Sequence, residues 1–217
     1  MLRASDFGVN PLIMNNVLPR RPYRQSARAR AAEETGERIL DAFSARLRDG
    51  WFDEIRLEDV AAAAGVTVQT VIRRFGGKTG LLEAQGERLS TEVQGRRDVS
   101  PGDIEGAIEA LLDDYEASGD LVMRSLAQED RHPAIRRLTE LGRGYHRAWL
   151  DAVFAPWLAE LSADEARRRT DALVAATDVY LWKLMRRDMA RPLPEYRRLV
   201  ETLVAAALAA APGKETS

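Results

Sequence analysis

Residues 57–78 read LEDVAAAAGVTVQTVIRRFGGK, and the spacing of this stretch decides the fold of the N-terminal part of the chain. Apolar residues recur at helical spacing before Gly65, and again between Thr67 and Gly76. Gly65 can adopt the positive φ that a tight turn after a helix requires. The Thr67 hydroxyl can accept a hydrogen bond from the first turn of a second helix. We therefore predict two short helices across a tight turn, which is a helix-turn-helix.

The second predicted helix carries side chains suited to DNA. A recognition helix enters a major groove about 12 Å wide, so it needs small or hydrogen-bonding side chains at its start and cations near its end. Glutamine can bind an adenine edge, threonine can bind bases or phosphates, and arginine can hold phosphate or guanine with two donors. We assign base reading to Val68, Gln69 and Thr70. The predicted phosphate contacts are Arg56, Thr67, Arg73, Arg74 and Lys78.

With its flanks, this stretch resembles the TetR family of bacterial transcriptional regulators. The resemblance covers residues 36–82 and rests on residues 38–42, Gly50, Val60, Ala61, residues 64–67, Thr70, Val71, Phe75, Lys78, Leu81 and Leu82. Family members usually carry Tyr in place of Ile72 and Tyr or His in place of Arg74, both as phosphate contacts. They usually carry Thr or Ser in place of Arg56. The resemblance implies DNA binding with one phosphate hydroxyl lost at Ile72, one cation added at Arg74 and a helix cap missing at Arg56.

Residues 57–78 allow two interpretations other than a DNA-binding head. Gly77, Lys78 and Thr79 are similar to the end of a phosphate-binding loop, but that pattern would require glycine at Ile72, and no strand precedes it. Alanine-rich helices with an internal glycine also occur as plain core packing. DNA binding is the interpretation that uses the whole spaced pattern.

Composition narrows the class of protein. The 217 residues are 45% hydrophobic, which suffices for a core, and the net charge is −2, with the acidic excess in the C-terminal half. Cysteine is absent and only His132 and His146 offer imidazole, so we expect neither a metal nor a cofactor. The longest apolar run, residues 203–211, is too short to span a bilayer, and no signal peptide is recognisable. We expect a cytoplasmic protein without a membrane partner.

Residues 1–32 show no helical periodicity and contain three prolines, so we predict a flexible basic extension. No acidic residue interrupts its last part, residues 20–32. Arginines in such arms can lie in a narrow minor groove, although a solvated disordered tail is the alternative. The arginines of this run are Arg20, Arg21, Arg24, Arg28 and Arg30, and the last three are predicted DNA contacts.

The complete chain predicts an all-α fold of about nine helices. Turn residues at 99–102 mark the main domain boundary. In the head, a first helix over 33–49 braces the helix-turn-helix, and Trp51 joins the core. In the body, we expect helices that stop near Gly119 and a continuous helix over 163–190. The predicted parts are the extension (1–32), the DNA-binding head (33–82), a linking helix (83–100), a helical ligand-binding and dimerisation body (101–211) and a tail (212–217).

The last two predicted helices carry an apolar stripe wider than one core requires, which indicates an association surface, with packing inside the chain as the alternative. Residues 178–188, with residues 131–133 and 142–143, resemble the C-terminal domain of many actinobacterial-type TetR regulators. That resemblance implies a four-helix homodimer interface. The predicted interface residues are Leu173, Thr177, Leu181, Leu199, Leu203, Val204, Ala207 and Leu208.

The family resemblance also implies an effector pocket among the middle helices, and a linking helix that carries motion between pocket and head. An apolar lining with a few polar tips suits such a pocket, although each of these side chains could equally belong to the core. The predicted lining residues are Met123, Leu126, Tyr145, His146, Trp149, Phe154, Tyr180 and Met185.

These patterns and the family resemblance predict a homodimeric transcription regulator. The resemblance implies a repressor released from a palindromic operator in double-stranded DNA by a small apolar or amphipathic effector. An enzyme would require a nucleophile with its base or paired carboxylates in a cleft. The acidic pairs at 113–114 and 129–130 are interpreted as solvated faces, so no catalytic residue is assigned. The alternative is a helical ligand-binding or scaffold protein with a degenerate DNA-binding head, which Ile72 in place of Tyr favours.

Overall fold

The computed structural model describes the backbone of residues 22–209 and the side chains of residues 28–209. Throughout this range the regular structure is helical, with no strand, which confirms the all-α prediction. The elements are α1 (Pro22–Asp49), the 3₁₀ turn η1 (Phe52–Glu54), α2 (Leu57–Ala64), α3 (Val68–Phe75), α4 (Lys78–Arg96), α5 (Ile104–Leu126), α6 (Pro133–Val153), α7 (Ala155–Leu158), α8 (Ala163–Thr177), α9 (Val179–Lys183), the π-helical turn η2 (Leu184–Asp188) and α10 (Leu193–Ala209). No helix in the described range combines the length and the apolar character that a membrane crossing requires.

The chain divides into a small unit, Met1–Glu37, and a large unit, Arg38–Ser217. In the small unit, α1 begins at Pro22, well before the predicted start at residue 33. Alanine, arginine and glutamate dominate residues 28–37, and these are strong helix formers even without an apolar stripe. Proline is tolerated in the first turn because its missing N–H would have no partner there. The prediction of a structureless extension is therefore wrong from residue 22 onward.

The core of the head is built from four helices of the large unit. Its fully buried side chains are Ile39 and Phe43 of α1, Val60 of α2, Val71 of α3 and Leu81 of α4. In the short η1 turn, Phe52 is buried, whereas Trp51 is 46% exposed. The prediction that Trp51 joins the core is wrong, because residue 51 is the extended N-cap of η1 and only the next side chain is buried.

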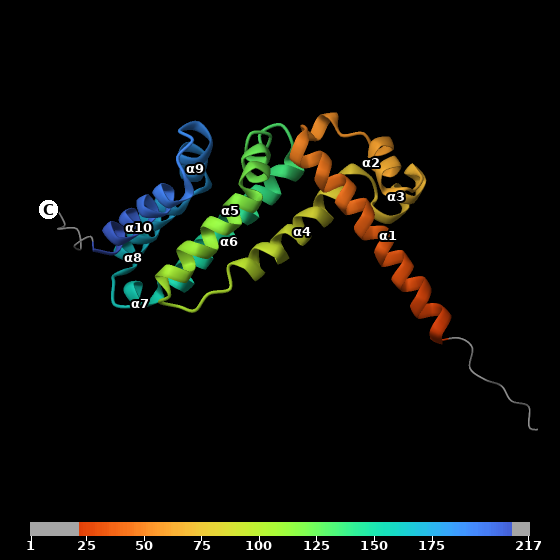
Figure 1. Cartoon of the computed structure of the whole chain (residues 1–217). Coiled ribbons are helices and arrows are strands. Elements are labelled where there is room, and N and C mark those ends of the chain that lie inside the picture. The colour runs from red at the N-terminus through yellow and green to blue at the C-terminus, as the bar shows by residue number, and fades with distance from the viewer. Residues whose placement is uncertain (1–21, 210–217) are drawn as a thin grey trace, which may run out of the picture. The chain divides into compact units, whose positions relative to one another are not determined.

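The body packs α5, α6, α8, α9 and α10 around a second core. Figure 1 shows α5 and α6 side by side and α8 beside α10. The predicted long helix over 163–190 is interrupted at Asp178, whose backbone is extended and whose carboxylate caps α9 by accepting from the Tyr180 N–H at 2.8 Å. The break starts a new helix direction for α9 and η2.

Gly119 does not stop a helix, because α5 continues through it to Leu126. A Cβ atom at position 119 would lie 2.5 Å from the Trp182 ring, so glycine here permits close contact between α5 and the buried indole. The predicted break near Gly119 is therefore wrong. The glycine serves packing between two helices.

We expect Gly119→Ala to destabilise the fold by about 1–3 kcal/mol, because the added methyl group overpacks against Trp182. Gly144→Ala in α6 is the matched control, since nothing lies within 4 Å of its added Cβ. Removing that helical glycine should stabilise the chain by up to about 1 kcal/mol. Urea unfolding measures both changes. Equal stability of the two variants would contradict the packing role of Gly119.

Candidate nucleic-acid interface and effector region

The turn between α2 and α3 has the geometry that the sequence predicts. Gly65 ends α2 with a φ of 67°, in the left-handed region where a Cβ atom is unfavourable. Thr67 caps α3, and its hydroxyl accepts from the Thr70 N–H at 3.2 Å. Gly76 ends α3 with a φ of 75°. Both ends of α3 are thus fixed by local backbone requirements, and this sets the direction of the helix.

One side of α3 holds the helix in the head, and the other side is open. Val71 is fully buried, and Val68 and Phe75 pack partly buried against the same core. The exposed side chains are Gln69, Ile72, Arg73 and Arg74, and Thr70 is half-buried. No described residue forms an ion pair with either arginine. The exposed side of α3 therefore presents an amide, two unpaired cations and one aliphatic group.

Val68 and Thr70 differ from Gln69, the third predicted base reader. The Val68 side chain is half-buried and packs against the head core. The Thr70 hydroxyl lies 3.0 Å from the Thr67 hydroxyl, so each already has a polar neighbour. Gln69 is the fully exposed hydrogen-bonding residue among the three predicted base readers.

Two predicted phosphate contacts have partners inside the head. Arg56 lies at the N-cap of α2 without a capping bond from its side chain, and its exposed guanidinium lies 3.7 Å from Glu58. Lys78 donates to the carbonyl oxygens of Asp53 at 3.1 Å and Ile55 at 2.9 Å, and its ammonium lies 4.6 Å from the centre of the Phe52 ring. Burial lowers the pKa of the Lys78 ammonium from its ordinary value.

These contacts change the interpretation of Lys78. Two of its three N–H donors bind backbone oxygens, and the ring of Phe52 lies against the cation. Within the described part of the chain, these contacts fix η1 and the following Ile55 to the start of α4, and a phosphate contact by Lys78 stays a prediction.

The predicted N-terminal DNA contacts lie in the small unit. Arg28 and Arg30 are exposed residues of α1. Arg24 lies on α1, but only its backbone is described, and Arg20 and Arg21 lie outside the described residues. The arginines from residue 24 onward are thus on a helix and not on an extended arm.

The eight predicted effector-pocket residues differ in exposure. Trp149, Phe154 and His146 are buried, whereas Tyr180 is 55% exposed at the start of α9. Asp178, whose backbone is extended, separates α9 from α8. Met123, Leu126, Tyr145 and Met185 are partly buried against the body core.

A buried polar cluster occupies the region where the pocket was expected. Arg97, at the end of α4, is 5% exposed and donates to the Asp114 carboxylate at 2.7 and 2.9 Å. Arg96 binds the other carboxylate oxygen at 2.8 Å. The Arg97 guanidinium lies 5.1 Å from the centres of both the Tyr115 and Trp149 rings. The interpretation of Asp114 as a solvated acid is therefore wrong.

His146 connects this cluster to α8. Its Nδ1 lies 2.9 Å from Arg97 Nη1, and its Nε2 lies 3.0 Å from the Thr177 hydroxyl. Arginine can only donate, so Nδ1 must accept and Nε2 must carry the proton. The Thr177 hydroxyl in turn donates to the Leu173 carbonyl at 2.7 Å. Burial, together with the positive charge of Arg97, lowers the pKa of His146 to about 3.

Sequence reasoning missed Arg97 and Asp114, although one signal was present for the acid. Asp114 follows Leu111 by three residues and precedes Ser118 by four, and all three side chains are buried on one stripe of α5. No local pattern identifies Arg97 as its partner, because the contact joins two different helices.

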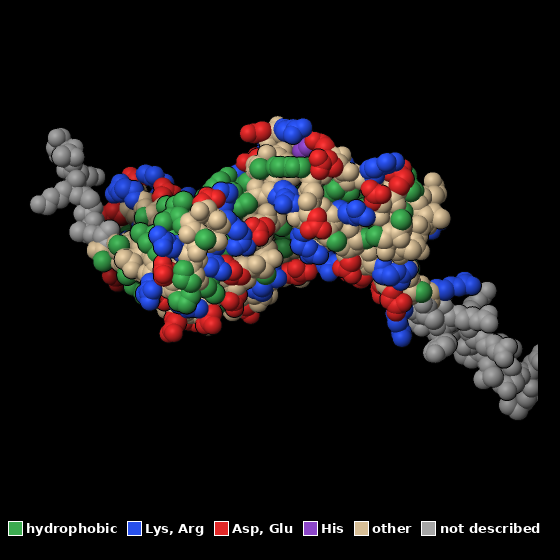
Figure 2. All heavy atoms as spheres, turned by 45° about the horizontal axis from the view of Figure 1, so that its top comes forward, with side chains coloured by type: hydrophobic (Ala, Val, Ile, Leu, Met, Phe, Trp, Pro, Cys, Tyr) green, Lys and Arg blue, Asp and Glu red, His purple; other side chains and the backbone are tan. Residues whose placement is uncertain are grey.

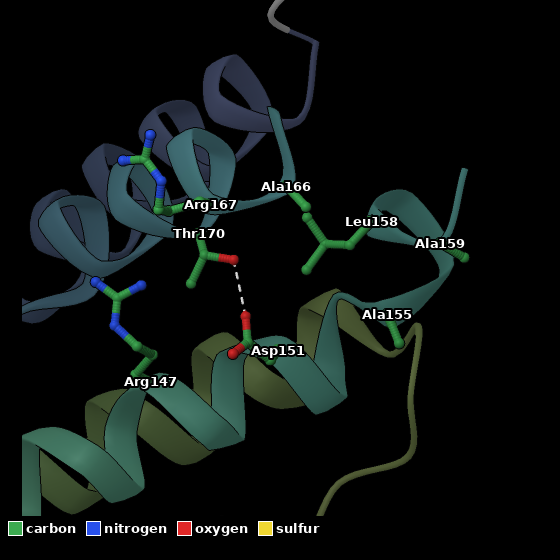
Figure 3. A pocket seen from close by; sticks show the side chains of 8 residues that line it. All are labelled: Arg147, Asp151, Ala155, Leu158, Ala159, Ala166, Arg167 and Thr170. Carbon is green, nitrogen blue, oxygen red and sulfur yellow. Dashed lines mark hydrogen bonds between the residues drawn. The ribbon is translucent and has the colours of Figure 1, made fainter. Parts of the chain in front are cut away.

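A surface hollow of about 530 Å³ lies between α6, α7 and α8 (Figure 3). Its lining residues are Arg147, Asp151, Ala155, Leu158, Ala159, Ala166, Arg167 and Thr170. In Figure 3 the Thr170 hydroxyl points toward Asp151, with which it forms a 2.8 Å hydrogen bond. Arg147 is paired with Asp171 at 2.6 Å. None of the predicted effector residues lines this hollow, and its polar groups already have partners, because Arg167 is paired with Asp164 at 3.4 Å.

The predicted dimer-interface residues fall into two groups of four. Leu173, Thr177, Val204 and Ala207 are buried inside the chain, so they are not available to a second copy. Their helical stripe is used by the contact between α8 and α10 and by the body core. The other four reach the surface: Leu181, Leu199, Leu203 and Leu208.

No group of three or more His, Asp or Glu within the described range is arranged to hold a metal ion. The polar groups with defined roles are instead the exposed side of α3 and the buried cluster around Arg97. Together they describe a helix-turn-helix head joined by one helix to a helical body, which is the class of DNA-binding transcription regulators.

Comparison with known proteins shows what the chain is similar to. The sequence model described as "Bacterial regulatory proteins, tetR family" matches residues 47–84. The HTH-type transcriptional regulator AlkX of Mycobacterium tuberculosis is 29% identical over 166 residues, which cover 72% of this chain and 70% of AlkX. A solved structure of a Pseudomonas aeruginosa PAO1 protein assigned as a transcriptional regulator aligns with a TM-score of 0.60 at 19% identity, covering 80% of this chain and 89% of that one, and shows the same fold. Residues 47–84 therefore match the TetR family of bacterial regulatory proteins, and over about 70% of its length the chain is similar to an HTH-type transcriptional regulator.

We expect Lys78→Ala to lower the free energy of unfolding by about 1–3 kcal/mol, because two charge-assisted bonds to η1 are lost. Arg73→Ala removes an exposed, unpaired cation and should change stability by at most about 0.5 kcal/mol. Urea unfolding of the two variants measures this difference. In DNA titrations against salt, only Arg73→Ala should flatten the slope, by about one unit. A flattened slope in Lys78→Ala with unchanged stability would restore its role as a phosphate contact.

We expect the free energy of unfolding to decrease as the pH is lowered, because His146 must be neutral in the folded state. Its folded pKa lies below its unfolded value of 6.5, so stability is complete above that value and is lost as the pH falls toward about 3. At pH 5 the loss from this residue should be about 2 kcal/mol relative to pH 7.5. Urea unfolding at both pH values should show a smaller loss for His146→Gln, whose amide can accept from Arg97 and donate to Thr177. An identical pH dependence in both proteins would contradict the assignment.

Proposed function

We propose that this regulator acts as a homodimer, as a repressor that leaves a palindromic operator when a small amphipathic or apolar molecule binds its body. In this proposal residues 33–82 are the DNA-binding head, residues 83–100 the linking helix, residues 101–211 the effector-binding and dimerisation body, and residues 212–217 a tail. The observation that carries it is the open side of α3, where Gln69, Arg73 and Arg74 stand exposed on a helix fixed at both ends.

In the proposed complex α3 enters the major groove. Gln69 reads an adenine edge, because its amide is exposed and both its donor and its acceptor can engage N7 and N6. Arg73 and Arg74 bind phosphates, as does Arg56 once its weak surface pair with Glu58 opens. The Thr67 and Thr70 hydroxyls and the Val68 methyl groups lie at the start of α3, where the helix approaches the bases. We also propose Arg24, Arg28 and Arg30 as DNA contacts, as the sequence predicts.

The proposed dimer uses the apolar surface at the α8–α10 end of the body. In Figure 2 hydrophobic side chains gather near the C-terminal end, whereas acidic and basic side chains are mixed over the rest of this face. Exposed large apolar residues in this part include Leu184 and Leu203. Together with Leu181, Leu199 and Leu208 they offer a surface for a second copy. A two-fold partner places the two α3 helices on successive turns of the major groove.

The proposed effector acts through α4. One end of this helix carries Leu81 and Leu82 into the head core, and the other end leads directly into Arg97 and its buried cluster. A molecule that enters near His146 and Trp149 competes with the bonds of this cluster and favours a different position of α4. It weakens DNA binding only as far as it prefers that second conformation. An amphipathic molecule suits this region better than a purely apolar one, because the polar groups it displaces need new partners.

We expect wild-type protein to select an inverted repeat from random duplex DNA, with half-sites about one helical turn, ~34 Å, apart. Leu203→Glu should lower the fraction of dimer in sedimentation experiments and abolish selection of the repeat, because it places charge in the proposed interface. Leu141→Glu is the control, since Leu141 is 70% exposed on α6, outside that surface. Selection of a single half-site by a monomer would contradict the dimer. No selected sequence at all would favour a degenerate head.

A further inference from the structure

Ile72 is a large aliphatic residue in an unusual position, because it stands 41% exposed on the helix that faces DNA in the proposed function. The packing of α3 into the head is supplied by Val71, Val68 and Phe75. Ile72 is therefore not needed to hold α3 in place. An exposed β-branched residue also gives no advantage in helix propensity. Its methyl groups are left with no structural task inside the described part of the chain.

Ile72 lies beside Gln69 and Arg73 on the open side of α3. Residues three apart on a helix lie about 5–6 Å apart at Cβ, so Ile72 is the next side chain along the surface from Gln69. Arg73 lies four residues after Gln69 and is also exposed. Ile72 thus borders the amide that can read an adenine and lies on the open side of α3. A separation of one helical turn corresponds to about one or two base-pair steps of ~3.4 Å.

The chemistry of the major groove offers one apolar group to such a side chain, the C5-methyl group of thymine. Cytosine carries only a hydrogen at the same C5 position, so an isoleucine gains no methyl contact there. Contact with thymine instead removes two apolar surfaces from water. An aliphatic group beside Gln69 therefore distinguishes thymine from cytosine.

We infer that Gln69 and Ile72 read A·T base pairs together, with Ile72 contacting a thymine C5-methyl group next to the adenine bound by Gln69. This inference rests on the proposed function, because it takes the open side of α3 as the DNA-facing side. It makes Ile72 a specificity-determining residue.

The test begins with the duplex that wild-type protein selects from random DNA. Each thymine of one half-site is replaced in turn by deoxyuridine, which removes only the C5-methyl group and leaves base pairing intact. We expect one or two positions beside the selected adenine to weaken binding by about fourfold, the value of one methyl group withdrawn from water. The other thymines should tolerate the replacement.

Three variants identify the side chain that senses the methyl group. Ile72→Ala should bind the thymine and deoxyuridine duplexes equally at that position, whereas Ile72→Val, which keeps a branched aliphatic group, should retain a preference for thymine. Gln69→Ala should relax the requirement for adenine but keep the response to the methyl group. Leu141→Ala is the control for removal of an exposed leucine far along the chain on α6. Unfolding curves should show that Ile72→Ala is as stable as wild type, because its side chain is exposed.

The outcomes separate this inference from the function on which it rests. A selected site that tolerates deoxyuridine at every thymine would support the DNA-reading head and overturn the role of Ile72. So would an Ile72→Ala protein that still discriminates the methyl group at the same position. Unchanged binding of Ile72→Ala to all duplexes would assign the exposed side chain to a protein partner instead. Failure of wild-type protein to select any sequence would count against the proposed function itself.

Discussion

The end of α4 is tied to the body by one buried cation, the Arg97 guanidinium. A charge that is only 5% exposed is costly to desolvate, and its cost is offset only by close and complete pairing. Asp114 supplies two bonds, His146 supplies an acceptor, and the rings of Tyr115 and Trp149 cover the guanidinium. Removing one partner leaves a buried charge without compensation. The end of α4 is thereby held in one position relative to α5 and α6.

The same helix is held at its other end by apolar packing. Leu81 and Leu82 of α4 belong to the head core, and Lys78 at its first residue binds the backbone of η1. In the proposed mechanism, movement of α4 in the body is transmitted to the head core against which α3 packs. The mutually dependent bonds of the Arg97 cluster fit two discrete arrangements of α4 in that mechanism better than a gradual displacement.

The parts of the fold that the sequence predicts are those decided by local backbone requirements. Gly65, Thr67 and Gly76 each cap a helix through contacts within about one helical turn. The helix-turn-helix can therefore be predicted without knowledge of any distant contact. The hydrogen bonds of Lys78 to the backbone could not be predicted from the local sequence, because its partners Asp53 and Ile55 lie outside α4. Asp114 and Gly119 were misinterpreted for the same reason, since each is explained by a side chain from a different helix. Helix α1 was underestimated because its early residues favour a helix through propensity and not through an apolar stripe.

Polar side chains are paired with one another in the body but exposed on α3. In the body, Arg97, Asp114, His146 and Thr177 satisfy one another, so any change there alters several bonds at once. On α3 the exposed side chains have no bonds of this kind to maintain, because packing is left to the opposite side. Substitutions on that exposed side can therefore change which sequence is read with little effect on stability. Ile72 fits this separation: its side chain is exposed, so exchanging it costs the fold little, whereas an aliphatic residue in place of His146 would leave Arg97 Nη1 without its acceptor.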